Sequence, residues 1–264
     1  MKVIRIVSTL VLALLISSCG NLRIKAYQAY LPGSEVKNVA LTGFYMAPPK
    51  LPEVPATDAK AFNEKVFTLS KKINERLQSN SDRYYQTLAQ GLEMQLGVNV
   101  IYGEEMESRA RYDRLKQKEE REGLKIAKQP NFPNLILAEG SLHLFEVENG
   151  DLEAYINDNP RMRAELRGAS KGLESEVVAF AYARPVIDRV TTFGEKANLR
   201  LLVDVYLYDD RGELVGHTYG ETKPVTIDGK AISDYDQVFN LYAGLKAEML
   251  TALTLVEEEE EEDE

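Results

Sequence analysis

The sequence predicts an α/β fold of the α+β type, with a mixed sheet of about five strands and helices packed against it. Apolar residues recur at helical spacing within residues 57–97 and again after residue 233, whereas residues 199–207 alternate between apolar and polar side chains. These are the periods of an amphipathic helix and of a half-buried strand. With 264 residues, 44% of them hydrophobic, the chain is long enough for one large domain with a substantial core.

Residues 1–18 have the features of a secretory signal peptide. Lys2 and Arg5 precede a mostly apolar run over Ile6–Ile16, and two serines then lead to Cys19, the only cysteine of the chain. The apolar run is shorter than the about 20 residues that a membrane-spanning helix needs. A basic start, an apolar run of this length and small residues at its end together indicate a segment that is cleaved on export.

The segment Ile16–Cys19 resembles the lipobox of bacterial lipoproteins. The resemblance implies that the signal is removed before Cys19 and that the sulfur of Cys19 carries a diacylglycerol. Gly20, where an aspartate would retain the protein in the inner membrane, implies an outer-membrane location facing the periplasm. The alternative is a buried free cysteine that follows an uncleaved anchor. With Cys19 acylated, no thiol would remain for a disulfide.

The first part of the mature chain is expected to be a tether followed by a strand. Residues 19–36 are mixed and polar, and we expect them to hold the domain, predicted over residues 37–255, away from the membrane. Asn38–Met46 is rich in β-forming residues and predicts a mostly buried strand. Residues 47–56 contain four prolines, which favour an extended connection.

Two amphipathic helices are expected next, over residues 57–78 and Ser81–Gly97. Val98–Tyr102 predicts a short strand, and the charged residues 104–128 predict a helix that lies mostly in water. The apolar positions that predict the first helix are Phe62, Val66, Leu69, Ile73 and Leu77.

The second half of the domain is expected to end in a hairpin and a helix. Leu135–Val147 predicts a long strand with a bulge at Gly140. Residues 148–195 are expected to be an insert that contains a short strand at Val177–Ala183. Leu199–Thr222 predicts two strands joined by a turn, and the apolar spacing after Ser233 predicts a closing helix. The insert is the expected place for a partner-binding surface, because variable segments outside the core carry many binding sites.

The order of these elements resembles the periplasmic lipoproteins related to the curli secretion protein CsgG, the synthase activator LpoB and the N-terminal domain of TolB. The resemblance lies in Asn38–Phe44, Ser81–Gly97, Asn134–Leu142 with its Glu-Gly-Ser, and Leu199–Thr222. It implies roles in the assembly, secretion or activation of envelope machinery, without catalytic residues, and it leaves a homo-oligomer open.

An oligomeric secretion lipoprotein of the CsgG type is the second hypothesis, but the strands that its pore needs are not predicted. Such pores contribute membrane-spanning hairpins, whose strands need about 9–11 residues. Val177–Ala183 is shorter than this and is followed by Pro185.

One pattern suggests a hydrolase as a further alternative. Gly168–Gly172 has the form G-x-S-x-G around Ser170, and Asp204 and His217 follow in the order of a catalytic triad. That chemistry requires the serine on a sharp turn between a strand and a helix, but Arg161–Arg167 is a charged stretch of helical character. A chance match is therefore the preferred interpretation.

No motif predicts a cofactor or a metal. His143 and His217 fall on separate strands, and neither has a second histidine or a cysteine at ligand spacing. We interpret both as sheet residues with ordinary hydrogen bonds. The net charge of −10 gives no basic surface for a nucleic acid.

The remaining carboxylates have structural interpretations. Asp209 and Asp210 lie at the expected hairpin turn, where aspartate can bond its own backbone. Glu139 is expected on a strand, where an inward carboxylate would need a partner. Residues 256–264, which are acidic from Glu257 onward, are expected to form a disordered tail, which either solubilises the chain or binds cations weakly. Together these observations predict a lipid-anchored, non-enzymatic envelope protein that acts on a protein partner.

Overall fold

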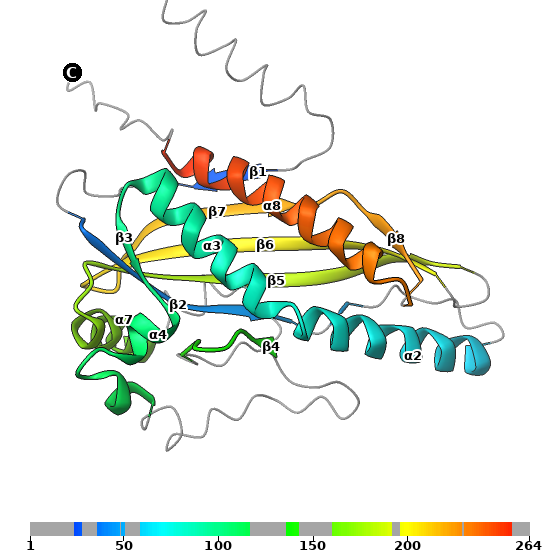
Figure 1. The fold of residues 1–264 in the computed structure, drawn as a ribbon, viewed down its shortest axis with the longest axis horizontal. Helices are drawn as coiled ribbons and strands as arrows, with labels where there is room; N and C mark the ends of the chain where they lie inside the picture. The colour runs from blue at the N-terminus through cyan, green and yellow to red at the C-terminus, as the bar shows by residue number, and fades with distance from the viewer. Residues whose placement is uncertain are drawn as a thin grey trace, which may run out of the picture.

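The structure is a computed structural model in which one mixed sheet separates two layers of helices (Figure 1). It describes residues 24–27, 36–47, 49–50, 59–116, 136–142, 160–191, 196–228 and 230–254. Within these ranges, no helix is both long and apolar enough to cross a membrane. The signal sequence, Cys19, His143 and residues 256–264 lie outside the described ranges.

The sheet confirms the predicted fold class. Its main path runs in the order β1, β7, β6, β5, β2, β3, while β4 pairs with β2 and β8 pairs with β6. β2 is parallel to β3 and β5, and the other pairs are antiparallel. The strands are β1 (Ile24–Tyr27), β2 (Asn38–Met46), β3 (Asn99–Ile101), β4 (Ile136–Leu137), β5 (Val177–Val190), β6 (Ala197–Asp209), β7 (Leu214–Glu221) and β8 (Val225–Ile227).

Helices cover the two faces of the sheet unequally (Figure 1). α3 and α8 lie side by side across one face, which we call the helix-covered face. α7 packs near one end of the opposite face. The helices are α2 (Ala59–Gln78), α3 (Ser81–Leu96), α4 (Gly103–Glu107), α7 (Pro160–Leu173) and α8 (Ile232–Thr254).

Elements with a strong local pattern form as predicted. β2 has the predicted bounds, and eight of its nine residues are buried. α2 buries Val66, Leu69, Ile73 and Leu77 of its predicted apolar face. α3 ends where Gly97 adopts a left-handed conformation with φ 67°, which glycine tolerates without strain. The hairpin of β6 and β7 and the closing helix α8 are also confirmed.

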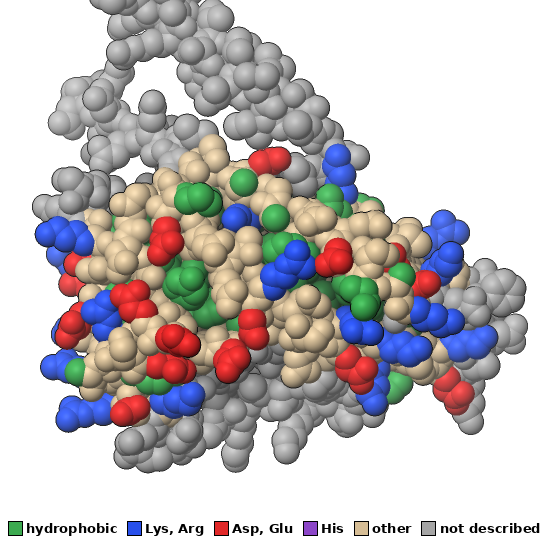
Figure 2. Space-filling model, in the orientation of Figure 1, with side chains coloured by type: hydrophobic (Ala, Val, Ile, Leu, Met, Phe, Trp, Pro, Cys, Tyr) green, Lys and Arg blue, Asp and Glu red, His purple; other side chains and the backbone are tan. Residues whose placement is uncertain are grey.

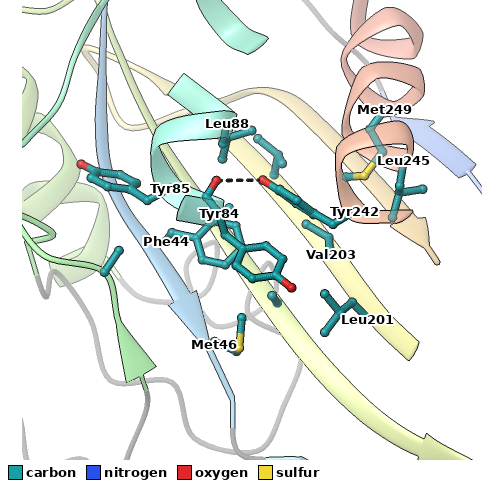
Figure 3. Packing of buried hydrophobic residues seen from close by; sticks show 14 of the residues in the cluster. Phe44, Met46, Tyr84, Tyr85, Leu88, Leu201, Val203, Tyr242, Leu245 and Met249 are labelled. Atoms are coloured by element: carbon teal, nitrogen blue, oxygen red, sulfur yellow. Dashed lines mark hydrogen bonds between the residues drawn. The ribbon is translucent and has the colours of Figure 1, made fainter. Parts of the chain in front are cut away.

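Aromatic side chains join α3 and α8 over β2 (Figure 3). Tyr84 and Tyr242 lie with their ring centroids 4.7 Å apart, and Phe44 meets Tyr242 edge-on at 5.9 Å. The hydroxyl of Tyr242 donates a hydrogen bond of 3.1 Å to the backbone oxygen of Tyr84. Burial raises the pKa of Tyr242 well above its usual range. The ring therefore packs in the core while its one polar atom has a partner.

α8 approaches β7 closely at Gly220. A Cβ atom at this position would lie 2.6 Å from Cδ1 of Leu245 and 2.8 Å from Sδ of Met249. Ordinary carbon contacts are near 3.5–4.0 Å. The absence of a side chain at Gly220 thus lets α8 lie close to the sheet.

The predicted long strand at Leu135–Val147 is wrong over its described part. β4 contains only Ile136 and Leu137, and the chain turns at Gly140, where φ is +77°. The backbone nitrogen of Ser141 donates to the carbonyl of Ala138 within this turn. Glu139 is therefore exposed rather than inward. The irregularity expected at Gly140 is thus a turn with positive φ, on either side of which Ala138 and Leu142 still donate to backbone carbonyls of β2.

Residues 160–190 are part of the sheet and its helical cover, which differs from the expected insert over residues 148–195. β5 lies between β2 and β6 and includes Pro185 within its 14 residues. Pro185 is tolerated because the backbone of its partner Leu201 bonds Thr222 on the other side of β6. The expectation that this strand is too short for a spanning hairpin is therefore wrong.

Two further expectations change. The charged helix expected over residues 104–128 is interrupted after Glu107, and its apolar residues Met106 and Tyr112 are buried instead of lying in water. Both belong to a small cluster that includes Leu142 and Leu173. Residues 24–27, which fall in the expected tether, form β1 at the edge of the sheet.

We predict that Gly220→Val lowers the free energy of unfolding by about 1–3 kcal/mol, because the new side chain must displace Leu245 and Met249. Gly244→Ala is the matched control on the exposed side of α8, where no atom lies within 4 Å of the new Cβ. It should raise stability by up to about 1 kcal/mol, as alanine favours a helix over glycine. Urea unfolding measures both; equal stability of the Gly220→Val variant and the parent would contradict the close approach.

Candidate functional site

The face of the sheet opposite α3 and α8 carries a group of polar and aromatic side chains, which we call the polar ladder. It begins beside the part of the sheet that α7 covers and runs along β5, β6 and β7. Its members are Tyr182, Arg184, Asp188, Arg200, Asp204, His217, Tyr219 and Glu221. They share one face because alternate residues of a strand point the same way.

Strand register places the ladder in rows. Tyr182 is opposite Asp204, and Asp204 is opposite Tyr219 on the next strand. One step along the strands, Arg184 is opposite Leu202, and Leu202 is opposite Glu221. Neighbouring rows are close enough for diagonal contacts between long side chains. The ladder is therefore a product of non-local pairing between strands.

Asp204 is the centre of the ladder. Its side chain is 6% exposed, and its two oxygens have different partners. Oδ1 lies 3.0 Å from Nε2 of His217, and Oδ2 accepts a hydrogen bond of 2.6 Å from the guanidinium of Arg184. Arg184 is 40% exposed, so the charge of this buried carboxylate is balanced by a cation that reaches solvent. A buried carboxylate needs such partners to remain charged.

Arg200 forms the second centre, nearer the end of the strands. Its guanidinium donates to Asp188 at 2.9 Å and also to Glu221, while the hydroxyl of Tyr219 donates to the other oxygen of Glu221. Burial lowers the pKa of Arg200, but the hydrogen bond and charge of Asp188 with the charge of Glu221 raise it overall. Burial and then the bond to Glu221 raise the pKa of Tyr219 far above its usual range. Both groups therefore keep their protons across the physiological range.

Aromatic rings connect the ladder to α7. His217 stacks on Tyr206 with centroids 4.3 Å apart, and Tyr206 stacks on Phe180 at 5.2 Å. Met162 and Leu166 of α7 belong to the same cluster as Phe180 and Tyr206. These contacts fix the ring of His217 beside Asp204, so the end of the ladder next to α7 is rigidly positioned.

The polar ladder contains the kinds of side chain that can contact another molecule. Each of its two arginines is paired with a carboxylate, and tyrosine and arginine are residue types enriched in the energetically important parts of interfaces. Tyr182, Arg184, Leu202 and Tyr219 are each only partly buried. The described ranges contain no group of three or more histidine, cysteine or acidic residues that could hold a metal ion.

The structure brings together two members of the suggested triad and places the third elsewhere. Asp204 and His217 are in contact, but Ser170 lies within α7 and is 2% exposed. Its hydroxyl donates a hydrogen bond of 2.7 Å to the carbonyl of Ser175. Gly168–Gly172 is thus continuous helix rather than the strand-to-helix turn that exposes a nucleophile.

Other residues singled out in the sequence have structural roles. Oδ1 of Asp209 accepts hydrogen bonds from the backbone nitrogens of Arg211 and Glu213, as expected for a hairpin turn. The backbone nitrogen of Glu139 donates to Asp82 at the start of α3. His217 does lie on a sheet strand as interpreted, but its partner is a buried carboxylate.

The sequence does not identify Arg184, Arg200 or Glu221 as site residues. The alternation over residues 199–207 places Arg200 and Asp204 on the same face, which was the available signal. Arg184 reaches Asp204 only because β5 pairs with β6, and no short sequence pattern predicts that pairing.

Comparison with known proteins gives no family for the chain. No family model matches it, and no curated protein matches it. Among solved structures, it is similar to the PelC dodecamer from Paraburkholderia phytofirmans, in two crystal forms, one of a point variant. In each case, identity is 8%, the match covers 88% of this chain and 97% of the other, and the TM-score is 0.35. At that TM-score the likeness supports no inference about this chain.

We predict that Asp204→Asn lowers the free energy of unfolding by about 1–3 kcal/mol, because Arg184 and His217 lose their shared buried acceptor charge. Asp210→Asn, in the exposed turn of the same hairpin, is the control and should change stability by less than about 0.5 kcal/mol. Chemical denaturation of the parent and both variants measures the difference. Equal effects of the two substitutions would mean that the ladder does not depend on Asp204.

Proposed function

We propose that this protein is a lipid-anchored lipoprotein of the cell envelope. It serves as a non-enzymatic scaffold, assembly factor or regulator of an envelope complex, in the manner of the CsgG-, LpoB- and TolB-like lipoproteins that the sequence resembles. Cys19 carries the lipid, and the expected location is the outer membrane, facing the periplasm. The observation that carries this proposal is the signal-like segment of residues 1–18, which ends at the only cysteine of the chain.

The polar ladder supports a role that depends on contact with a partner. It presents Tyr219, which is held by Glu221, and Arg184, which is held by Asp204, so little side-chain entropy of these residues remains to be lost on binding. Its ion pairs also give a surface with defined charge positions, which favours selection between partners. We assign the ladder as the partner-contacting surface.

Two alternatives have weaker support. A hydrolase that uses Ser170 would require this hydroxyl to leave a buried helix and its bond to Ser175. A CsgG-like secretion pore has strands of sufficient length in β5 and β6, with 14 and 13 residues. These two strands are nevertheless flanked by β2, β7 and β8 and contribute to the core, which favours a fixed role in the domain.

The lipid assignment predicts the mass of the native N-terminal peptide. Protein extracted from membranes with detergent should begin at Cys19 and carry the added mass of acyl chains, as measured by mass spectrometry. Cys19→Ala should retain residues 1–18 and lack the lipid, whereas Ser18→Ala keeps a small residue before the cysteine and should be processed normally. An intact N-terminus with an unmodified Cys19 in the native protein would refute the anchor.

The partner assignment predicts position-dependent crosslinking in intact cells. A photoreactive residue at Leu202, between Arg184 and Glu221 in the ladder, should give a discrete adduct heavier than the chain itself. The same residue at Glu75, exposed on α2, is the control and should not give that adduct. Gel mobility of the membrane fraction reports the outcome. No adduct from Leu202, or the same adduct from both positions, would contradict a partner-binding ladder.

A further inference from the structure

The first described strand leaves a short stretch of chain between the sheet and the proposed lipid. β1 begins at Ile24 and pairs antiparallel with β7, from Ile24 opposite Gly220 to Tyr27 opposite His217. A lipid on Cys19 would therefore be separated from Ile24 by five peptide steps. Because an extended residue spans at most about 3.6 Å, the reach is roughly 18 Å. The domain is confined near the lipid surface if Cys19 is acylated.

The position of Ile24 identifies which part of the domain is confined. Its partner Gly220 lies beneath Leu245 and Met249 of α8, and α8 also contacts β1. Figure 1 shows α8 passing over β1 at the same side of the sheet. The anchor is thus attached beside the C-terminal half of α8. α7 and the polar ladder lie on the opposite face of the sheet.

Apart from exposed Asp236 near its start, which pairs with Arg83 of α3, the outward side of α8 has few charges to desolvate. Between residues 237 and 252, the charged residues are Lys246 and Glu248. Lys246 turns back to donate a hydrogen bond of 3.0 Å to the carbonyl of Thr87, and burial lowers its pKa. The exposed positions along this stretch are Gln237, Asn240, Gly244, Ala247, Glu248 and Thr251. Figure 2 shows mainly uncharged side chains and backbone over α8.

We propose that the outward side of α8 lies against the lipid surface that holds Cys19, a deduction that rests on the proposed lipid anchor. The short connection brings this side to the headgroup layer, and its low charge reduces the cost of removing water there. The contact is at the headgroups, since the exposed residues are small or polar and cannot enter the hydrocarbon region. The orientation turns the polar ladder away from the lipid.

Single-cysteine labelling tests the orientation without interference, because the chain has no thiol other than the acylated Cys19. Ala247→Cys places a fluorophore on the exposed side of α8, and Lys171→Cys places it on an exposed position of α7 across the sheet. Full-length lipidated protein is reconstituted in phosphatidylethanolamine–phosphatidylglycerol vesicles that contain a nitroxide-headgroup lipid. Quenching at residue 247 should be several-fold stronger than at residue 171. Thr251→Cys and Arg167→Cys are a second pair, should either first variant fail to fold.

The outcomes separate the two proposals. Equal quenching at both positions, or stronger quenching at residue 171, in protein that floats with the vesicles overturns the orientation and leaves the lipid anchor standing. Weak quenching at residue 247 with fluorophore self-quenching that grows with protein density overturns it in favour of a second copy on α8. Failure of the parent protein to float with the vesicles removes the anchor and the orientation together.

Discussion

The pairing of β5 with β6 is the interaction on which the rest of the structure depends. This strand pairing extends from Val177 opposite Asp209 to Val190 opposite Ala197. It gives β5 one face of small residues, with Ala179, Ala181 and Ala183 beneath the helices, and another face of Phe180, Tyr182 and Arg184. A shift of one residue would exchange these faces and bring a charged guanidinium under α3 and α8. The core, the α7 contact and the polar ladder therefore share one register.

The sequence predicts elements whose pattern is local, such as β2, α2, α3, the β6–β7 hairpin and α8. Their apolar spacing alone identifies the buried face. The sequence does not predict the central position of β5. This strand pairs in parallel with β2, which lies far from it in the sequence, and parallel strands are not joined by a tight turn that a local pattern could reveal. Pro185 suggests an early end of β5 in the sequence. In the structure, its position opposite Leu201 means that no backbone hydrogen bond to β6 is lost. Gly140 marks an irregularity that the sequence predicts as a bulge, but the full turn with positive φ, which limits β4 to two residues, is not evident from apolar spacing.

The candidate site shows the same division. Asp204 and His217 follow Ser170 in the order of a catalytic triad. They nevertheless meet because they are neighbours on adjacent strands. Arg184 completes the group from a third strand, and only the register reveals it. A buried carboxylate with such partners adds little net stability over an apolar replacement, because desolvation offsets the attraction. We regard its specific geometry as its contribution, since a shifted β5 would leave Asp204 buried without Arg184.

The two faces of the sheet differ in charge, and this difference would determine which face of the domain lies against a membrane. On the helix-covered face, the outward side of α8 near β1 carries few charges. On the opposite face, the polar ladder holds its charges in ion pairs. If Cys19 carries a lipid as proposed, the short connection at the β1 edge would restrict rotation of the domain, so that one face would meet the headgroups and the other the aqueous side. Restricting rotation also raises the effective concentration of the ladder toward a partner held in the same membrane. A rigid sheet with helices on its lipid side would therefore present the ladder at a nearly constant height, which a long flexible tether would not do.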